Sequence, residues 1–152
     1  MSVYTTLQEL GITLPQVATP AAAYVPFVQT GNLVFLSGHI SKKDGAVWAG
    51  QLGRELTTAQ GREAARLVAI DLLGTLHAAC GDLGRVQRIV KLLGLVNSTA
   101  DYTEQHLVIN GASELLGEVF GAAGQHARSA FGVAQLPMGA AVEIELIVQL
   151  RA

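Results

Sequence analysis

Three charged side chains near the C-terminal end could act on a small carboxylic acid. Arg128 precedes Glu143 and Glu145, which are two residues apart. A guanidinium holds a carboxylate through two parallel hydrogen bonds, so Arg128 is a candidate anchor for an anionic substrate. Repulsion between the two glutamates, together with partial burial, would raise the pKa of one of them and create an acid–base group. The alternatives are structural: Arg128 pairs with a glutamate of another subunit, and of the two glutamates one is solvated and the other pairs with a nearby cation.

Residues 126–137, followed by residues 141–150, are predicted to form the two strands that position these side chains. In the second strand, apolar residues at every second position alternate with Glu143, Glu145 and Gln149, which is typical of a half-buried strand. In the first, large apolar residues alternate with Arg128 and several small residues. Both segments therefore predict strands with two unlike faces.

A turn at Pro137-Met138-Gly139-Ala140 would make these strands a hairpin. In that register Val133 pairs with Ile144 and Phe131 with Leu146, so the apolar sets share one face. Arg128 then lies on the glutamate face. The sequence thus predicts a shallow surface of small residues that carries one cation and two carboxylates.

Composition narrows the class of protein. The chain has 152 residues, half of them hydrophobic and 14% charged, which fits one domain that also buries surface between subunits. The net charge is −2 and the ten Lys and Arg form no stripe, so a nucleic-acid partner is not expected. No apolar run is long enough for a membrane span, and the single cysteine, Cys80, fits a reducing compartment. We therefore expect a soluble, cytoplasmic protein.

Metal and cofactor chemistry are not indicated. The four histidines show no metal-ligand spacing, and the glycines form no phosphate-binding or dinucleotide pattern, so we expect neither a metal site nor a cofactor. Ser37 has no recognisable base beside it, which favours a hydroxyl that lines a cleft over a nucleophile. Tyr24 either contacts a ligand or packs in an interface.

The remaining pattern predicts a two-layer α+β domain of order β-β-α-β-α-β-β, with two amphipathic helices on one face of a mixed sheet. Thr57 and Gln60 form a capping-box pattern at the start of the first long helix, which ends before Gly81. Gly94 is predicted as a bulge in the third strand. A short helix within residues 1–20 forms an N-terminal extension, and residues 21–152 form the domain. The predicted elements are a helix at 3–10, strands at 27–29, 33–37 and 86–96, helices at 57–80 and 102–120, and the two closing strands.

Several segments match a known family in order and spacing. They are Tyr24, Leu36-Ser37-Gly38-His39-Ile40, Gly81-Asp82-Leu83, Asn110, Ala127-Arg128-Ser129, Val133-Ala134-Gln135-Leu136-Pro137 and Val142-Glu143-Ile144-Glu145. Over about residues 21–151 the chain resembles the Rid family, or YjgF-like proteins, also called L-PSP endoribonucleases, and it looks closest to a less studied branch. The resemblance implies a chorismate-mutase-like fold, a homotrimer whose sheets form a central barrel, and ligand clefts between subunits.

The resemblance also implies roles for individual residues. Arg128 would bind a substrate carboxylate, and Glu143 would place the hydrolytic water. The residues that would line the cleft with Arg128 are Tyr24, Ser37, Gly38 and Asn110. His39, Ala130 and Glu145 are additional candidates.

Three positions depart from the family pattern. Members often have Cys at Ala130, Arg at Gln135 and Gln at His39. The changes at Ala130 and His39 fall in the implied cleft, so the substrate can differ even if the arginine anchor is retained.

Three functions follow as hypotheses. The first is a Rid-like hydrolase that deaminates reactive enamines or imines derived from amino acids. The second is a non-catalytic protein that binds a small carboxylate metabolite in the same cleft. The third is an endoribonuclease of the L-PSP type, against which the charge and the lack of stacking aromatic clusters weigh.

Overall fold

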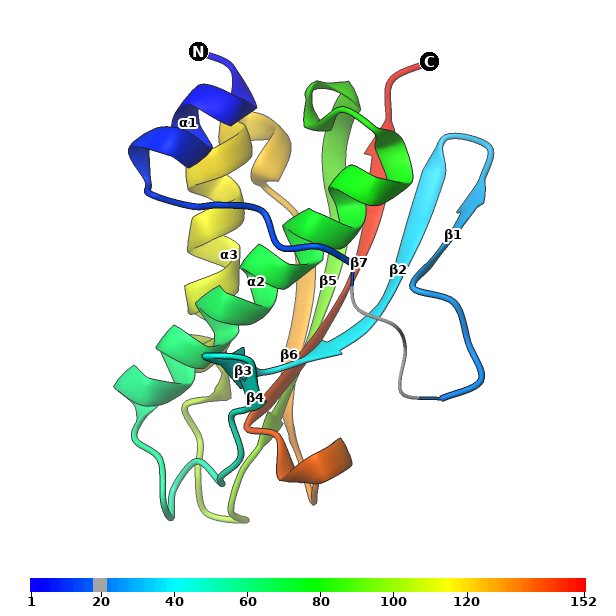
Figure 1. Ribbon diagram of the computed structural model, residues 1–152. Helices are drawn as coiled ribbons and strands as arrows, with labels where there is room; N and C mark the ends of the chain where they lie inside the picture. Colours follow the sequence, from blue (N-terminus) through cyan, green and yellow to red (C-terminus); the bar gives the residue numbers. More distant parts are fainter. Residues whose placement is uncertain (18–21) are drawn as a thin grey trace.

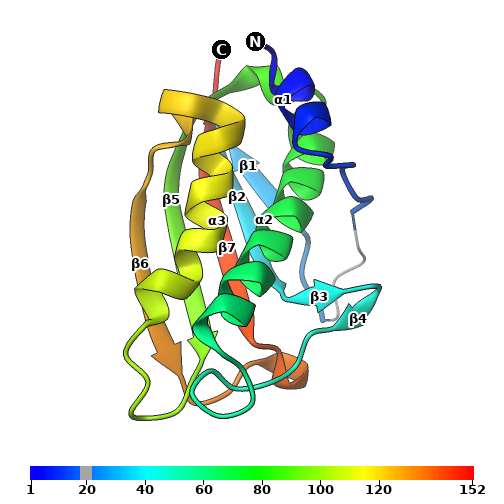
Figure 2. The same cartoon turned by 90° about the vertical axis from the view of Figure 1, so that its left-hand side faces the viewer.

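The protein is a two-layer α+β domain. The computed structural model describes residues 1–17 and 22–152. A five-stranded mixed sheet has the order β1-β2-β7-β5-β6, and the helices cover one face of it (Figures 1 and 2). The strands are β1 Phe27–Thr30, β2 Leu33–Ile40, β3 Lys42–Lys43, β4 Ala46–Val47, β5 Val86–Asn97, β6 Ala127–Val133 and β7 Val142–Leu150, and the α-helices are α1 Val3–Glu9, α2 Thr58–Cys80 and α3 Gln105–Phe120. The predicted fold class and the order of its main elements are confirmed.

Local sequence signals determine where helix α2 begins and ends. The Thr57 side chain accepts a hydrogen bond from the backbone N–H of Gln60, and the Gln60 side chain accepts one from the Thr57 N–H, which completes the predicted capping box. Gly81 ends the helix in the left-handed region at φ 76°. Both predictions are confirmed because both signals are local.

Helices α2 and α3 pack in backbone contact. A Cβ built on Gly111 of α3 would lie 2.1 Å from the carbonyl oxygen of Arg62 in α2, so only glycine permits this approach. Two ion pairs, Arg62–Glu114 at 2.6 Å and Arg66–Glu118 at 3.5 Å, join the helices at the surface. Exposed pairs of this kind contribute little, so apolar packing fixes the helix layer.

The bulge predicted at Gly94 is wrong. The register of β5 with β7 shifts between Val86 and Arg88 and between Ile89 and Lys91 instead. A Cβ on Gly94 would lie 2.7 Å from two carbon atoms of the Ile109 side chain, so this glycine lets α3 pack closely on the sheet. A second difference is the small β3–β4 hairpin, which turns at Asp44 and Gly45, both at positive φ.

The predicted closing hairpin is also wrong. Strand β5 lies between β6 and β7, parallel to β6 and antiparallel to β7. Val133 therefore pairs with Asn97, and Phe131 with Leu95. Residues 134–141 carry the chain past the end of β5 instead of folding it back on β6.

This pairing changes the faces of β6. Phe131 is 48% exposed, on the face away from the helices, and not in the core. Arg128 lies level with Leu92 and Leu146, both buried beneath the helices. Because side chains alternate along a strand, Arg128 faces the helix layer while Glu143 faces the opposite side. The prediction that Arg128 shares a face with the glutamates is therefore wrong.

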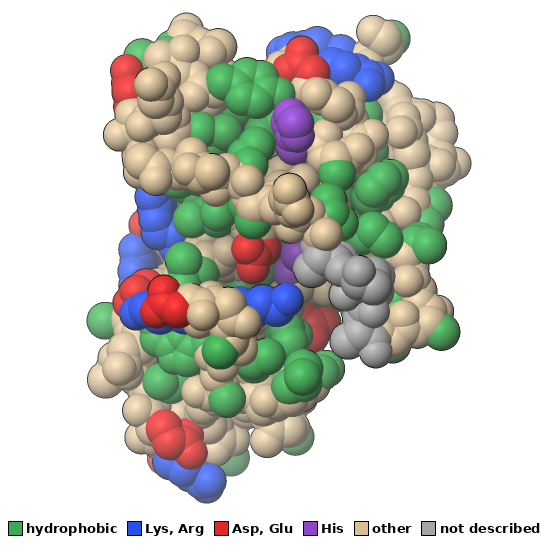
Figure 3. Space-filling view, in the orientation of Figure 1, with side chains coloured by type: hydrophobic (Ala, Val, Ile, Leu, Met, Phe, Trp, Pro, Cys, Tyr) green, Lys and Arg blue, Asp and Glu red, His purple; other side chains and the backbone are tan. Residues whose placement is uncertain are grey.

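The sheet face opposite the helices leaves apolar side chains in contact with solvent. Val28, Phe35 and Phe131 are 55%, 40% and 48% exposed. Figure 3 shows apolar side chains at the surface on the side formed by β1 and β2. An uncovered apolar face of this kind is typical of a surface that meets another protein chain.

The N-terminal helix packs on the domain. Ser2 caps α1, Leu7 is 3% exposed within the core, and the Tyr4 hydroxyl accepts a hydrogen bond from the Leu83 N–H at 2.9 Å. The predicted boundary between residues 20 and 21 lies outside the described residues. No helix in the described ranges is both long and apolar enough to cross a membrane.

Candidate functional site

Arg128 is held against α3 by neutral oxygen atoms. Its Nη1 donates to the Asn110 Oδ1 at 2.8 Å and to the Ser113 Oγ at 3.3 Å, and its Nη2 donates to the His106 carbonyl oxygen at 3.2 Å. The three acceptors come from one face of α3, since residues three and four apart on a helix are neighbours. The structure thus places Asn110, which was expected to line the same cleft, in contact with Arg128.

Two N–H groups of the Arg128 guanidinium have no hydrogen-bond partner among the described residues. The guanidinium has five N–H groups, of which these bonds use three, so the Nε–H and one Nη2 hydrogen remain. Among the described residues, no carboxylate lies within ion-pair distance of Arg128. Burial lowers the pKa of Arg128 from its ordinary value, although an arginine stays charged in proteins. A partly buried cation with two free donors and no described counter-ion is suited to a carboxylate ligand.

A further hydrogen-bond chain reaches Arg128 through Ser113. The His126 Nδ1 lies 2.6 Å from the Gly124 carbonyl oxygen, which can only accept, so in the neutral ring this nitrogen carries the proton. The Nε2 then accepts from the Ser113 hydroxyl at 2.9 Å. We call Arg128, Asn110, Ser113 and His126 the arginine half-site. The histidine was not predicted here, because metal-ligand spacing along the chain does not reveal a contact between a helix and the segment that follows it.

Glu143 lies over Gly38 on the other side of the sheet. A Cβ on Gly38 would lie 2.4 Å from the Glu143 Oε2, so the absence of a side chain there makes room for the carboxylate. Burial, and secondarily repulsion from Glu145, raises the pKa of Glu143 above its ordinary value, as predicted for one of the two glutamates. No described residue donates a hydrogen bond to this carboxylate.

Ser37 connects this carboxylate region to the segment before β1. Its hydroxyl donates to the Val25 carbonyl oxygen at 2.6 Å, next to Tyr24, whose side chain is 51% exposed. The Ser37 proton is therefore engaged with backbone, which suits a positioned hydroxyl and not a nucleophile. We call Glu143, Gly38 and Ser37 the glutamate half-site.

His39 turns away from the glutamate half-site. It pairs in register with Ile144, whereas Ile40 pairs with Glu143, so the His39 side chain faces α2. Its Nδ1 lies 2.7 Å from the Ser37 carbonyl oxygen, and its Nε2 lies 2.8 Å from the hydroxyl of the buried Thr75. Burial lowers the pKa of His39, which favours the neutral ring in this contact.

The other candidate residues occupy different positions. Ala130 is half-buried and packs against the core beside the arginine half-site. Glu145 is exposed on the opposite sheet face, next to Leu93 and Ile147. Gln135 accepts hydrogen bonds from the Asn97 Nδ2 at 2.6 Å and from the Leu136 N–H at 3.1 Å, so it fixes the segment between β6 and β7.

The two half-sites of one chain cannot hold the same small molecule. Glu143 pairs with Leu95, three residues along β5 from the Leu92 that pairs with Arg128. Two strand spacings and three residues along the strand separate their backbones by about 14 Å. The side chains also leave opposite faces of the sheet. Any site that contains both groups must therefore take them from two chains.

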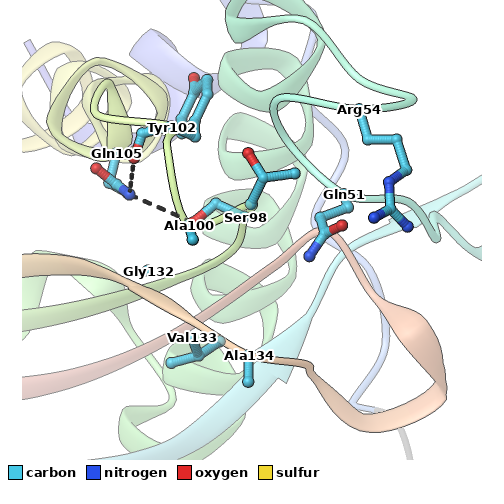
Figure 4. Close-up of a pocket in the computed structure, with 10 residues that line it drawn as sticks. Gln51, Arg54, Ser98, Ala100, Tyr102, Gln105, Gly132, Val133 and Ala134 are labelled. Carbon is cyan, nitrogen blue, oxygen red and sulfur yellow. Dashed lines mark hydrogen bonds between the residues drawn. The ribbon is translucent and has the colours of Figure 1, made fainter.

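A separate hollow of about 500 Å³ lies at the end of β6. Figure 4 shows Gln51 and Arg54 on one side of it and Tyr102 and Gln105 on the other. Ser98 accepts a hydrogen bond from the Gln105 Nε2 at 3.3 Å above the bare Gly132. None of the predicted site residues lines this hollow. In the described part of the chain, no group of His, Cys, Asp or Glu side chains could hold a metal ion.

Comparisons with known proteins identify the relatives of this chain. Residues 5–150 match the family model described as "YjgF/chorismate_mutase-like, putative endoribonuclease". Protein TCP17 of Trypanosoma cruzi is 51% identical over 146 residues, which cover 95% of this chain and 91% of that protein.

Solved structures agree. One described as a "putative endoribonuclease" from Shewanella oneidensis is 31% identical, with a TM-score of 0.95 over 99% of this chain and 100% of the other. RidA from an Antarctic Psychrobacter is 26% identical, with a TM-score of 0.62 over 91% of this chain and 98% of the other. With the layered fold and the family model spanning nearly the whole sequence, these matches show that the chain belongs to the YjgF/chorismate mutase-like family.

Proposed function

We propose that this protein is a Rid-like hydrolase that deaminates reactive enamines or imines derived from amino acids. The observation that carries the proposal is the state of Arg128, a partly buried cation with two free N–H donors and only neutral partners among the described residues. An amino-acid-derived imine supplies the carboxylate that these donors fit. Its reactive carbon lies next to that carboxylate.

Glu143 supplies the acid–base chemistry in this proposal. Water adds to the imine carbon while the Glu143 carboxylate accepts a proton from it. The same carboxyl group returns that proton to the imine nitrogen, which gives a carbinolamine. The carboxylate then accepts the proton of the new hydroxyl group and passes it to the amino group, so that the C–N bond breaks and a keto acid and ammonia leave. A pKa raised by burial suits a group that must both accept and donate a proton near neutral pH.

The complete site lies between subunits in this proposal. The separation of the half-sites means that Arg128 comes from one copy and Glu143 from another. A homotrimer with clefts between neighbouring subunits would meet this requirement, and the exposed apolar face opposite the helices would be covered in it. Sedimentation of a monomer at working concentration would contradict the arrangement.

The test is hydrolysis of an imine generated in the assay from an amino acid. The wild-type protein should accelerate ammonia release over buffer, and Arg128→Ala should lower kcat/KM by at least about 100-fold, because each of the two hydrogen bonds to a charged group contributes about 1.5–3 kcal/mol. Activity that survives the substitution would refute the proposal.

Two other outcomes have their own meaning. Thermal stabilisation by keto acids that depends on Arg128, without turnover, would identify a non-catalytic carboxylate-binding protein. Cleavage of RNA by the pure protein, lost in Glu143→Gln, would favour the endoribonuclease activity for which several relatives are named. The net charge of −2 offers little attraction to phosphate.

A further inference from the structure

We infer that His126 is a positioning residue that orients the Arg128 guanidinium through Ser113. The inference rests on the proposed function, in which Arg128 binds a substrate carboxylate. It assigns a role to a histidine that touches neither the substrate nor Arg128 and acts only through the serine hydroxyl.

The direction of each hydrogen bond follows from the chemistry of its partners. The Gly124 carbonyl oxygen fixes the proton on the His126 Nδ1, and this leaves the Nε2 as an acceptor. The Ser113 proton must then point to the Nε2 at 2.9 Å. A lone pair of the Ser113 Oγ is thereby directed to the Arg128 Nη1 at 3.3 Å.

Without His126, the Ser113 hydroxyl would donate its hydrogen bond to a different acceptor. A serine inside a helix readily donates to a backbone carbonyl one turn earlier, here in α3. That rotamer would remove the lone pair from Arg128 and free one of the two Nη1 hydrogens. The guanidinium would then keep two contacts, to Asn110 and to the His106 carbonyl oxygen, and would be less restrained about its Cζ–Nε bond, so the two donors left for a carboxylate would hold their direction less firmly.

The backbone fixes the histidine in turn. A Cβ on Gly124 would lie 2.2 Å from the Leu116 carbonyl oxygen, so glycine is required for the turn after α3 to approach the helix this closely. This approach places the Gly124 carbonyl oxygen 2.6 Å from the His126 Nδ1. The chain of contacts therefore runs from the packing of that turn to the guanidinium.

Two substitutions test the contributions of the two ring nitrogens of His126 separately. His126→Asn retains a donor near the position of Nδ1 but has no acceptor that reaches Ser113. His126→Gln places its Oε1 near the position of Nε2 and can still accept from the serine. Ser113→Ala removes the connecting hydroxyl, and Gln125→Ala changes the exposed neighbouring residue as a control.

The first measurement needs no ligand. ¹⁵N NMR of the Arg128 side chain should show slow Cζ–Nε rotation in the wild type, His126→Gln and Gln125→Ala. Rotation should be faster in His126→Asn and Ser113→Ala. Equal rotation in His126→Asn and His126→Gln would overturn the inference.

The second measurement is the affinity for pyruvate by calorimetry, with pyruvamide as the uncharged comparison. His126→Asn and Ser113→Ala should weaken pyruvate binding about 3- to 10-fold, the effect of one hydrogen bond, while His126→Gln stays within about 2-fold. In turnover the loss should appear in KM and not in kcat, because the anchor acts equally in ground and transition states.

The outcomes distinguish the two proposals. If Arg128→Ala abolishes pyruvate binding but His126→Asn and Ser113→Ala bind as the wild type does, only the role of His126 is refuted. If the wild type does not distinguish pyruvate from pyruvamide, the proposed function is refuted, and the NMR comparison alone decides whether His126 orients the arginine.

Discussion

The charged groups of the arginine and glutamate half-sites lie in opposite kinds of environment. Arg128 is surrounded by oxygen acceptors, and three of its N–H groups have fixed partners. Glu143 lies over bare backbone at Gly38, without a hydrogen-bond donor among the described residues, and its pKa is raised. The first environment preserves a charge and orients it, whereas the second makes a charge easy to neutralise. In the proposed function, binding and proton transfer therefore belong to different faces of the sheet.

Mixing variants gives the largest expected effect. Arg128→Ala and Glu143→Gln should each be nearly inactive, but a co-refolded equal mixture should regain about a quarter of the wild-type activity, because a cleft between two chains can combine the intact arginine of one with the intact glutamate of the other. Ammonia release from the imine measures it. A mixture of Arg128→Ala with the double variant serves as the control and should stay inactive.

Gly124, which contacts His126 of the arginine half-site, should have a large effect on stability. In Gly124→Ala the new methyl group meets backbone of α3, so we expect a loss of about 2–3 kcal/mol, or roughly 5–10 °C in Tm. Gly117→Ala is the matched control within α3, where a Cβ would approach only the Gln125 side chain at 3.7 Å. That substitution should raise Tm slightly through helix propensity. Equal shifts in calorimetric scans would contradict the contact.

Glu143 should make stability depend on pH in a definite direction. Because its pKa is higher in the folded than in the unfolded chain, the folded state binds more protons just above the ordinary value of 4.5, and stability falls as pH rises through that window. Glu143→Gln should remove this fall and unfold at higher urea concentration than the wild type at neutral pH. Glu145→Gln should remove a smaller part, since repulsion is the lesser cause. A wild-type curve that rises over the same window would contradict this environment.

The glycine of the glutamate half-site should have the smallest effect on stability. Gly38→Ala places a methyl group against a carboxylate that can swing aside, so Tm should change by no more than about 2 °C. Because the Glu143 carboxylate is displaced, Gly38→Ala should nevertheless lose activity almost as completely as Glu143→Gln does. A large loss of Tm would show that the carboxylate is fixed more firmly than its contacts indicate.

Local signals predicted most of the fold. The capping box at Thr57, the terminal glycine at 81 and the alternation in β7 each act within a few residues, and all three hold. The partner of each strand depends on distant segments. Neighbouring strands in sequence usually pair, but residues 134–141 are long enough to pass the end of β5, and nothing in their composition distinguishes a turn from this crossing.

In the candidate site, too, some contacts could be predicted from the sequence, whereas contacts between distant segments could not. Family resemblance indicated Arg128 and Asn110, and the structure brings them to 2.8 Å. The alternation of Glu143 and Glu145 predicted a raised pKa, which holds for Glu143. The contact between Ser113 and His126 joins helix α3 to the residue before β6, and the spacing of residues along the chain does not reveal it. A histidine two residues before Arg128 was the available signal.

The central position of β7 has a consequence for folding. Strands β1 and β2 form one pair and β5 and β6 another, and β7 is the strand that joins the two pairs into a single sheet. It is synthesised after all the others, so during translation the two pairs have no shared hydrogen bonds and their unpaired edges stay open. We expect the domain to fold only once β7 has left the ribosome, and a chain truncated before Val142 to aggregate instead of forming a smaller stable sheet.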